Sequence, residues 1–199
     1  MKIACFDMEG TLTPEIWEQV ASDTGIDEFN KTTRDIPNYS ELMDFRLALM
    51  KELNLKISDI QGSIHKMQPL DGAVDFLNEI RKDYQVVILS DTFHEFAESL
   101  MEKLGYPLLL CHQLIINSDG SIDGYKLRHQ KAKKQAILAF QEIGYDCIAA
   151  GDSYNDIQMF EVARQGFFIN APRKISSEFS SYQSYDNYSD LLEAFKGLI

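Results

Sequence analysis

The chain contains only three cysteines, and their spacing is not that of a metal site or a disulfide framework. Cys5, Cys111 and Cys147 are odd in number, lie in apolar runs and form no CxxC pair. We therefore expect free thiols buried in strands. Metal-ligand spacing is equally absent from the four histidines, which are His65, His94, His112 and His129.

Long apolar runs are also missing. No stretch of about 18 apolar residues occurs, and the apolar residues near the N-terminus are interrupted at Asp7. A membrane-spanning helix needs about 20 apolar residues, and the apolar region of a signal peptide needs about 7 to 15. We therefore expect a cytoplasmic protein with no membrane partner.

Positive charge is scarce, because 19 Lys and Arg oppose 31 Asp and Glu and give a formal net charge of −12. The acidic residues are scattered, and such a surface repels nucleic acid and anionic lipid, which argues against either as a partner. Hydrophobic residues make up 45 % of the chain, enough for a sizeable core. A length of 199 residues suits one domain with a modest insertion. The oligomeric state cannot be read from these features.

The dominant pattern is an alternation of short apolar runs with helix-like stretches. The apolar runs are Ile3–Phe6, Tyr84–Leu89, Leu108–Cys111, Cys147–Ala150 and Gly166–Ile169. The helix-like stretches are Gly72–Lys82, His94–Leu104, Lys133–Ile143 and Asn155–Ala163. This order predicts an α/β fold with a mainly parallel sheet. One exception is Leu114–Tyr125, where Asn117-Ser118-Asp119-Gly120 separates two apolar runs and predicts a hairpin.

The alternation is interrupted between Phe6 and Tyr84, a gap far longer than the dozen or so residues that a crossover needs. Pro14 is suited to open a helix, and helical patterns follow at Tyr39–Leu53 and Ser58–Met67. We therefore predict a discontinuous α/β core, residues 1–13 and 70–199, and a helical cap, residues 14–69. Ligands of open α/β sheets bind outside the carboxyl ends of the strands, so an insertion there forms a lid.

Polar side chains follow three of the predicted strands. They are Asp7 and Glu9 after the first strand, Ser90 and Asp91 after the second, and Asp152, Asn155 and Asp156 after the fourth. Each has an ordinary explanation on its own, such as a turn, a helix cap or a loop. Their convergence at one edge of the sheet favours a catalytic site.

The chemistry that fits these groups is phosphoryl transfer through a covalent intermediate. Asp7 can attack phosphorus as a nucleophile, with Mg²⁺ held by Asp7 and Asp152 and with Asp156 in support. A hydroxyl and backbone N–H groups at Ser90-Asp91, together with one lysine, can hold the phosphate oxygens. Glu9, two residues after the nucleophile, can protonate the leaving alkoxide.

The chain resembles the haloacid dehalogenase-like phosphatase superfamily in four ordered motifs. They are Asp7-Met8-Glu9-Gly10-Thr11, Ser90-Asp91-Thr92, a lysine near 133, and Gly151-Asp152-Ser153-Tyr154-Asn155-Asp156. This resemblance implies a Rossmann-like sheet of order 3-2-1-4-5 with the first strand central. The helical insertion resembles the cap of the phosphoserine phosphatase branch of the superfamily.

Within that branch, Glu9 stands where most members have aspartate. This departure and several further segments are similar to the bifunctional phosphoserine phosphatase/phosphoserine:homoserine phosphotransferase group. The segments are Pro14-Glu15, Thr33-Arg34-Asp35-Ile36-Pro37, Ser90-Asp91-Thr92-Phe93 and Gly124-Tyr125-Lys126-Leu127-Arg128. The similarity covers most of the chain and fades after residue 172.

The resemblance implies a role for each matching residue. Asp7 is implied as the nucleophile and Glu9 as the acid/base, with Mg²⁺ bound by Asp7, the Glu9 backbone carbonyl and Asp152. The implied phosphate donor is O-phosphoserine, and the implied acceptor is water or homoserine. Contacts to phosphate or substrate are implied for Ser90, Asp91, Lys133 and Asn155, and contacts to the amino-acid end for Glu15 and Arg46.

The residues give partial support of their own for Arg46, which falls among the leucines on one face of the Tyr39–Leu53 helix. A guanidinium there needs an anionic partner or a route to water. A substrate carboxylate meets that need, and so does a side chain that extends from the edge of the face into solvent. Glu15 likewise suits either a substrate ammonium group or the first turn of a helix.

Four alternatives stay open. The phosphate-binding lysine is Lys131, Lys133 or Lys134, with Lys133 favoured by the alignment. The acceptor is water or homoserine, which leaves open serine or threonine biosynthesis as the pathway. A phosphatase of another small phosphomonoester fits the same residues. A non-catalytic receiver-like signalling module fits them less well, because a receiver has its phosphoacceptor on a middle strand and has no lid.

Overall fold

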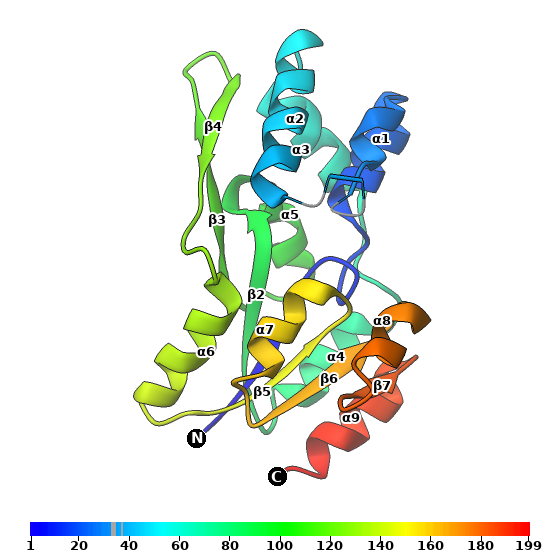
Figure 1. Ribbon diagram of the computed structural model, residues 1–199, viewed down its shortest axis with the longest axis vertical. Helices are drawn as coiled ribbons and strands as arrows, with labels where there is room; N and C mark the ends of the chain where they lie inside the picture. The colour runs from blue at the N-terminus through cyan, green and yellow to red at the C-terminus, as the bar shows by residue number, and fades with distance from the viewer. Residues whose placement is uncertain (33–34, 37) are drawn as a thin grey trace.

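A computed structural model describes residues 1–32, 35–36 and 38–199 of the protein. Its centre is a seven-stranded sheet with the spatial order β4-β3-β2-β1-β5-β6-β7 (Figure 1). The strands are β1 (Lys2–Phe6), β2 (Gln85–Phe93), β3 (Leu108–Ile116), β4 (Ile122–Lys126), β5 (Asp146–Gly151), β6 (Gln165–Ile169) and β7 (Gln183–Tyr185). Only the β3–β4 pair is antiparallel among these strands.

The sheet confirms the predicted α/β fold with a mainly parallel sheet. Strand β1 lies at the centre between β2 and β5, and the run β3-β2-β1-β5-β6 has the predicted 3-2-1-4-5 order. Two edge strands extend this run. The predicted hairpin provides β4, and Gln183–Tyr185 adds β7, a three-residue strand too short and too polar to give a strand signal in the sequence.

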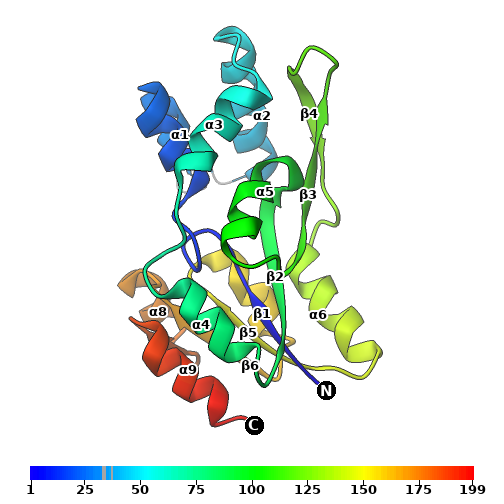
Figure 2. The ribbon, with the colours of Figure 1, turned by 180° about the vertical axis from the view of Figure 1, so that it is seen from behind.

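Helices cover both faces of the sheet (Figures 1 and 2). On one face lie α4 (Ala73–Ile80), α5 (His94–Lys103) and α9 (Tyr188–Lys196), and on the other lie α6 (Ala132–Glu142) and α7 (Ile157–Phe160). Strand β1 contributes to both layers, with Ala4 and Phe6 in one core cluster and Ile3 and Cys5 in the other. Burial on both faces explains why the parallel strands read as continuous apolar runs.

One predicted helix is shorter than expected. The stretch Asn155–Ala163 forms a 3₁₀ turn, η2 (Tyr154–Asp156), and α7, which ends at Phe160. The chain must turn back early because the Arg164 N–H already donates to the Cys147 carbonyl, at 2.9 Å, as β6 begins. A short helix α8 (Arg173–Glu178) then leads to β7.

The segment between β1 and α4 forms helices above the carboxyl ends of the strands (Figure 1). They are α1 (Ile16–Thr24), the 3₁₀ turn η1 (Asp27–Asn30), α2 (Tyr39–Glu52) and α3 (Ile57–Lys66). Trp17 of α1 stacks on Phe29 of η1, with ring centroids 5.5 Å apart, and meets Phe96 of α5 edge-on at 5.7 Å. These rings join the helical layer to the core, while the bounds 14–69 of a separate cap remain a prediction.

The β3–β4 hairpin supports the other side of this helical layer. Lys56, which precedes α3, lies 2.8 Å from the Asp119 carboxylate at the hairpin tip. The Ile57 N–H donates to the Gly120 carbonyl at 2.9 Å. Of the Thr33–Pro37 segment that supported the family resemblance, Thr33, Arg34 and Pro37 lie outside the described residues.

The three cysteines are free, as expected. Cys5 and Cys147 are buried as expected, while Cys111 is partly exposed, so the expectation of burial was wrong for that thiol. None of the helices in the described ranges is long and apolar enough to cross a membrane.

Candidate active site

Lys133 and two aspartates form the buried centre of the candidate site. The lysine, 1 % exposed, extends from the first turn of α6, and its Nζ lies 2.9 Å from Asp7 Oδ1 and 2.7 Å from Asp156 Oδ1. Burial alone would lower the pKa of Lys133, but Asp156, Asp7 and Asp91 hold it well above its ordinary value. The lysine is therefore charged, and its two ion pairs with described residues leave one of its three donors for a further anion.

The geometry also separates the three candidate lysines. Lys131 is exposed, and Lys134 forms an ion pair of 3.1 Å with the exposed Glu161. Only Lys133, of these three, reaches the carboxylate that follows β1. The position favoured in the sequence is thus the one that the structure brings to Asp7.

Asp156 braces the loop after β5. Its Oδ2 accepts from the backbone N–H groups of Asp152 and Ser153, at 3.0 and 2.9 Å, while its Oδ1 accepts from Lys133. A side chain at Gly151 would overlap the Asp156 carboxylate. Both oxygens of this fully buried carboxylate are therefore occupied by protein donors, which suits the supporting role predicted for it.

Asp152 is held from the other side by the loop after β1. Thr11 donates its hydroxyl to Asp152 Oδ1 at 3.0 Å. Gly10 passes so close that a Cβ there would overlap the Asp152 carboxylate, and its φ of +73° is in the left-handed region that glycine adopts readily. Glycine at this position lets the loop bring Asp152 next to Asp7.

Asp7, Asp152 and Asp156 offer carboxylate oxygens that all lie within 4.8 Å of one another. Hard oxygen donors at this spacing fit Mg²⁺. Because both oxygens of Asp156 are occupied, Asp7 and Asp152 are the carboxylates best placed to bind a cation. The Glu9 carbonyl, predicted as a further ligand, accepts no hydrogen bond from any described residue.

The charges of these aspartates favour the same cation. Burial, then Asp156 and Asp152, raise the pKa of Asp7 well above its ordinary value, although Lys133 opposes the shift. Burial and Asp156 raise the pKa of Asp152 to about 7. A divalent cation would stabilise both groups in the ionised form that ligation and nucleophilic attack require.

Glu9 reaches from the loop after β1 to the start of α1. Its Oε2 accepts from the Ile16 N–H at 2.9 Å, one of the unpaired donors of the first helical turn. Burial raises the pKa of Glu9, while the Ile16 N–H, Arg46 and Thr92 act in the opposite direction. A raised pKa suits a carboxyl group that must both hold and release a proton.

A bulge at the end of β2 shapes the phosphate side of the site. The register between β2 and β3 shifts from Leu89 opposite Leu110 to Phe93 opposite His112, so the backbone of residues 90–92 lies outside that ladder. Ser90 is 2 % exposed, and its Oγ accepts from the Thr92 N–H at 3.2 Å. This segment can therefore present backbone N–H groups to an anion.

Asp91 connects this bulge to neighbouring segments. Its Oδ2 accepts from the Asn155 side-chain amide at 2.9 Å, and its carbonyl accepts from the Tyr39 hydroxyl of α2 at 2.8 Å. Burial would raise the pKa of Asp91, but Lys133, His112 and Asn155 hold it well below its usual value. The two predicted substrate contacts, Asp91 and Asn155, are thus brought together.

Arg46 points into the helical layer and is only 7 % exposed. Its guanidinium lies 4.5 Å from the centroid of the Trp17 ring and donates to the Lys31 carbonyl at 2.8 Å. Nε is buried and has no hydrogen-bond partner among the described residues. Burial lowers the pKa of Arg46 to about 10, although Glu9, Tyr39 and Glu15 oppose this shift. The burial argues against a side chain that extends into solvent.

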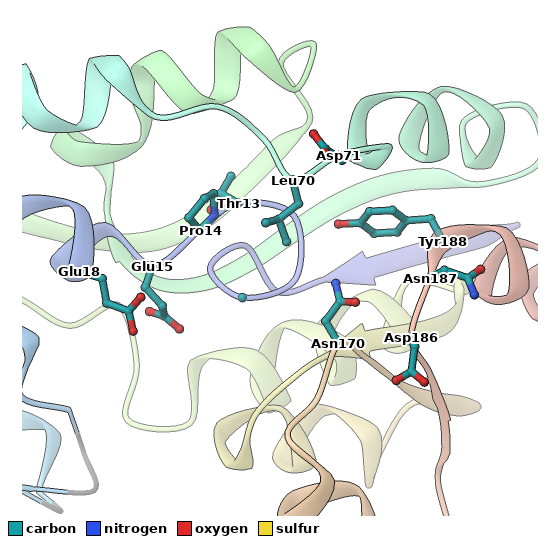
Figure 3. A pocket seen from close by; sticks show the side chains of 11 residues that line it. Thr13, Pro14, Glu15, Glu18, Leu70, Asp71, Asn170, Asp186, Asn187 and Tyr188 are labelled. Carbon is teal, nitrogen blue, oxygen red and sulfur yellow. The ribbon is translucent and has the colours of Figure 1, made fainter. Parts of the chain in front are cut away.

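Glu15 borders a cavity of about 520 Å³ that lies beside the loop after β1. Further carboxylates around this cavity are Glu18, Asp71 and Asp186, and Figure 3 shows Tyr188 pointing from the start of α9 toward that loop. Burial, then Glu9 and Glu18, raise the pKa of Glu15 to about 7. An ammonium group beside Glu15 would relieve this crowding of negative charge.

The groups that hold the predicted residues in place were not themselves predicted from the sequence. Thr11 lies inside the first motif, so its contact with Asp152 could have been suspected from its position. No sequence motif pointed to Tyr39 or His112 as residues of the site. Their contacts with Asp91 depend on how α2 and β3 pack beside β2.

Comparisons with known proteins agree with this geometry. The family model of a haloacid dehalogenase-like hydrolase matches residues 1–164. A curated phosphoserine phosphatase, ThrH, from Pseudomonas aeruginosa is 48 % identical over 98 % of this chain and 95 % of that protein. A phosphoserine phosphatase from Pseudomonas syringae pv. tomato is 46 % identical over 98 % of this chain and 82 % of that protein.

Solved structures show the same likeness. The crystal structure of a phosphoserine phosphatase in apo form has a TM-score of 0.80 and 25 % sequence identity, covering 98 % of each chain. A second structure, a phospho-aspartyl intermediate analogue of phosphoserine phosphatase, has a TM-score of 0.81 at 24 % identity and shows the shared fold. The family-model match covers well over half of the chain, and the four motifs converge at one edge of the sheet: this protein belongs to the haloacid dehalogenase-like hydrolase family.

Proposed function

We propose that the protein is a Mg²⁺-dependent phosphoserine phosphatase that also transfers the phosphoryl group to homoserine, through an aspartyl phosphate on Asp7. The observation that carries the substrate assignment is Arg46, a buried cation beside Glu9 and Glu15 whose Nε has no hydrogen-bond partner within the described part of the chain. The identity of 48 % to a curated phosphoserine phosphatase supports the same substrate.

Residues of the chain would bind the two ends of phosphoserine separately. Arg46 offers donors for the α-carboxylate, and Glu15 offers an acceptor for the ammonium group. The remaining proton of Lys133 and the backbone of the Ser90–Asp91 bulge receive the phosphate. A substrate that carries all three charged groups satisfies both the buried arginine and the crowded acidic side chains.

The first step forms the phosphoenzyme. A carboxylate oxygen of Asp7 attacks phosphorus, the bond from phosphorus to the serine oxygen breaks, and its electron pair leaves on that oxygen. Glu9 gives its proton to the leaving oxygen, so serine departs with its hydroxyl restored. Bound Mg²⁺ would neutralise phosphate charge and keep Asp7 ionised. Asp7 is already fixed for attack, because Oδ1 accepts from Lys133 and from the Met8 N–H at 2.7 Å.

The second step returns the enzyme to its starting state. Water or the homoserine hydroxyl attacks phosphorus, the bond to the Asp7 oxygen breaks, and the carboxylate is released. The attacking hydroxyl gives its proton to Glu9, which is then ready to act as an acid again. Water yields inorganic phosphate, and homoserine yields phosphohomoserine.

Phosphorus NMR tests the proposal directly. The protein is incubated with Mg²⁺ and O-phosphoserine, with and without homoserine. Phosphohomoserine beside inorganic phosphate would support both activities, and inorganic phosphate alone would reduce the proposal to a phosphatase. No turnover in either sample would contradict the substrate assignment.

Arg46→Met separates phosphoserine from other small phosphomonoesters. Loss of the guanidinium should raise KM for phosphoserine by about tenfold or more, because a charge-assisted contact is removed. Hydrolysis of an aryl phosphate, which has no carboxylate, should change far less. Arg173→Met, which alters an exposed arginine of α8, is the matched control. An equal loss toward both substrates would favour another phosphomonoester as the natural one.

A further inference from the structure

His112 is a buried histidine that the proposed reaction does not use. It lies in β3, opposite Phe93 at the end of the β2 bulge, and is 5 % exposed. Its ring contacts Tyr39 and Phe93, each with a centroid separation of 6.2 Å. A polar ring buried between aromatic neighbours needs hydrogen-bond partners for both nitrogens.

The two ring nitrogens have different partners. Nδ1 accepts from the Arg128 N–H at 3.2 Å, which places the proton of the neutral ring on Nε2. Nε2 faces Asp91 Oδ1 at 3.5 Å. The backbone before α6 thus orients the histidine so that its N–H points at Asp91.

Asp91 is held between two donors and away from a third. Oδ1 faces His112, and Oδ2 accepts from Asn155 at 2.9 Å. Lys133 lowers the pKa of Asp91, yet the ion pairs of Lys133 among the described residues are with Asp7 and Asp156. The charge of the lysine therefore stabilises the ionised form of Asp91, although the two side chains form no ion pair.

This separation matters because Lys133 has three donors and two are already in use. If Asp91 turned to the lysine, a protein carboxylate would occupy the donor that a phosphate oxygen needs. A third carboxylate beside Lys133 would also repel the incoming phosphate.

We propose that His112 is a positioning residue, which together with Asn155 holds the Asp91 carboxylate off Lys133 and so keeps one lysine donor free for phosphate. The inference rests on the proposed phosphoryl-transfer function, and it adds a residue to the phosphate-binding side of that site. It predicts that removal of the His112 donor weakens phosphate binding, and that this loss depends on the negative charge of Asp91.

The test is calorimetric binding of inorganic phosphate to the Mg²⁺-loaded protein. His112→Phe keeps an aromatic ring between Tyr39 and Phe93 but removes the donor to Asp91. We expect the dissociation constant of phosphate to rise about tenfold. His112→Gln, which retains a side-chain N–H donor, should recover most of this loss, and His65→Phe, an exposed histidine of α3, should change nothing.

A double-mutant cycle with Asp91→Asn shows whether the effect passes through Asp91. Without the negative charge, His112→Phe should cause no further loss of phosphate affinity. In an aryl phosphatase assay, His112→Phe alone should raise KM more than it lowers kcat. His112→Met carries the same test if His112→Phe does not fold.

Two results would overturn the inference: wild-type phosphate affinity in folded His112→Phe, or an undiminished effect of that change in the Asp91→Asn background. A wild-type protein that binds no phosphate would overturn it as well. If phosphate binds as expected but phosphoserine is not turned over, only the substrate assignment fails.

Discussion

The ammonium group of Lys133 and the carboxylate of Asp7 form a 2.9 Å ion pair inside the protein, where their side chains are 1 % and 8 % exposed. Lys133→Met should abolish phosphatase activity and lower the free energy of unfolding by about 3–5 kcal/mol, because it leaves buried carboxylates without their cation. Denaturant unfolding and an aryl phosphatase assay measure the two effects.

Lys134→Met is the matched control for that change. Lys134 is one residue away, and its pair with Glu161 is exposed, so its removal should cost at most about 1 kcal/mol and leave the rate unchanged. Equal effects of the two substitutions would show that the buried position has no special role.

Gly10→Ala should impair Mg²⁺ binding. The new methyl group would meet the Asp152 carboxylate, and the φ of +73° adds strain of about 1–2 kcal/mol. Gly25→Ala is the control, because Gly25 has a similar φ of +69° but nothing within 4 Å of the added Cβ. Calorimetric titration with Mg²⁺ should show weaker binding in Gly10→Ala only; matching losses would refute the steric argument.

Tyr188 connects the C-terminal helix to the loop after β1. Its hydroxyl donates to the Thr11 carbonyl at 2.6 Å, and its ring stacks on Phe76 at 5.0 Å. Tyr188→Phe should lower the free energy of unfolding by about 0.5–1.5 kcal/mol, because the hydrogen bond is lost and the stacking is kept. Tyr185→Phe, which removes an exposed hydroxyl contact with Gln183, should have a smaller effect in the same unfolding experiment.

The metal-free protein should become less stable as the pH rises from about 5 to about 8. Burial raises the pKa of Asp7, Glu9 and Asp152 in the folded state, that of Asp152 to about 7. A carboxyl group whose pKa is higher in the folded state binds more protons there, so the unfolding free energy falls through this interval. Under the proposed function Mg²⁺ would bind the ionised carboxylates, so its stabilising effect should grow with pH.

Thermal unfolding with Mg²⁺ and with a chelator, at about pH 5.5 and about pH 8, measures both trends. Asp152→Asn removes one of the shifted groups and should flatten the pH dependence of the metal-free protein. A metal-free protein that gains stability over this interval, relative to Asp152→Asn, would contradict the prediction.

The fold was largely predictable because its signals are local. Apolar runs such as Ile3–Phe6 predict a strand, and the turn residues at Asn117–Gly120 predict a hairpin, each from its own residues. The order of the parallel strands in the sheet followed from the family resemblance. Strand β7, which was not predicted, and helix α7, which is shorter than predicted, show where such local signals fail. Strand β7 is set by its pairing with β6, and the end of α7 is set by the bond from the Arg164 N–H to the Cys147 carbonyl of β5, so both depend on contacts outside their own segments.

The candidate site was predictable where chemistry and motif coincide. Asp7, Lys133 and Asp152 do converge, and the structure shows in addition that Asp156 is already occupied by protein donors. His112 could not be predicted, since its partners Arg128 and Asp91 come from separate segments. Contacts that hold a site in place depend on packing, and packing leaves little trace in one sequence.

Arg46 illustrates a compromise between stability and function. Its buried Nε has no partner among the described residues, so the free protein carries a desolvated cation that a phosphoserine carboxylate would complete under the proposed function. The desolvated Arg46 then lowers the stability of the free enzyme, and substrate binding gains part of its free energy by removing this cost. A chain selected only for thermal stability would replace this arginine with an apolar residue, and it would lose its selectivity for an amino-acid phosphate as it gained robustness.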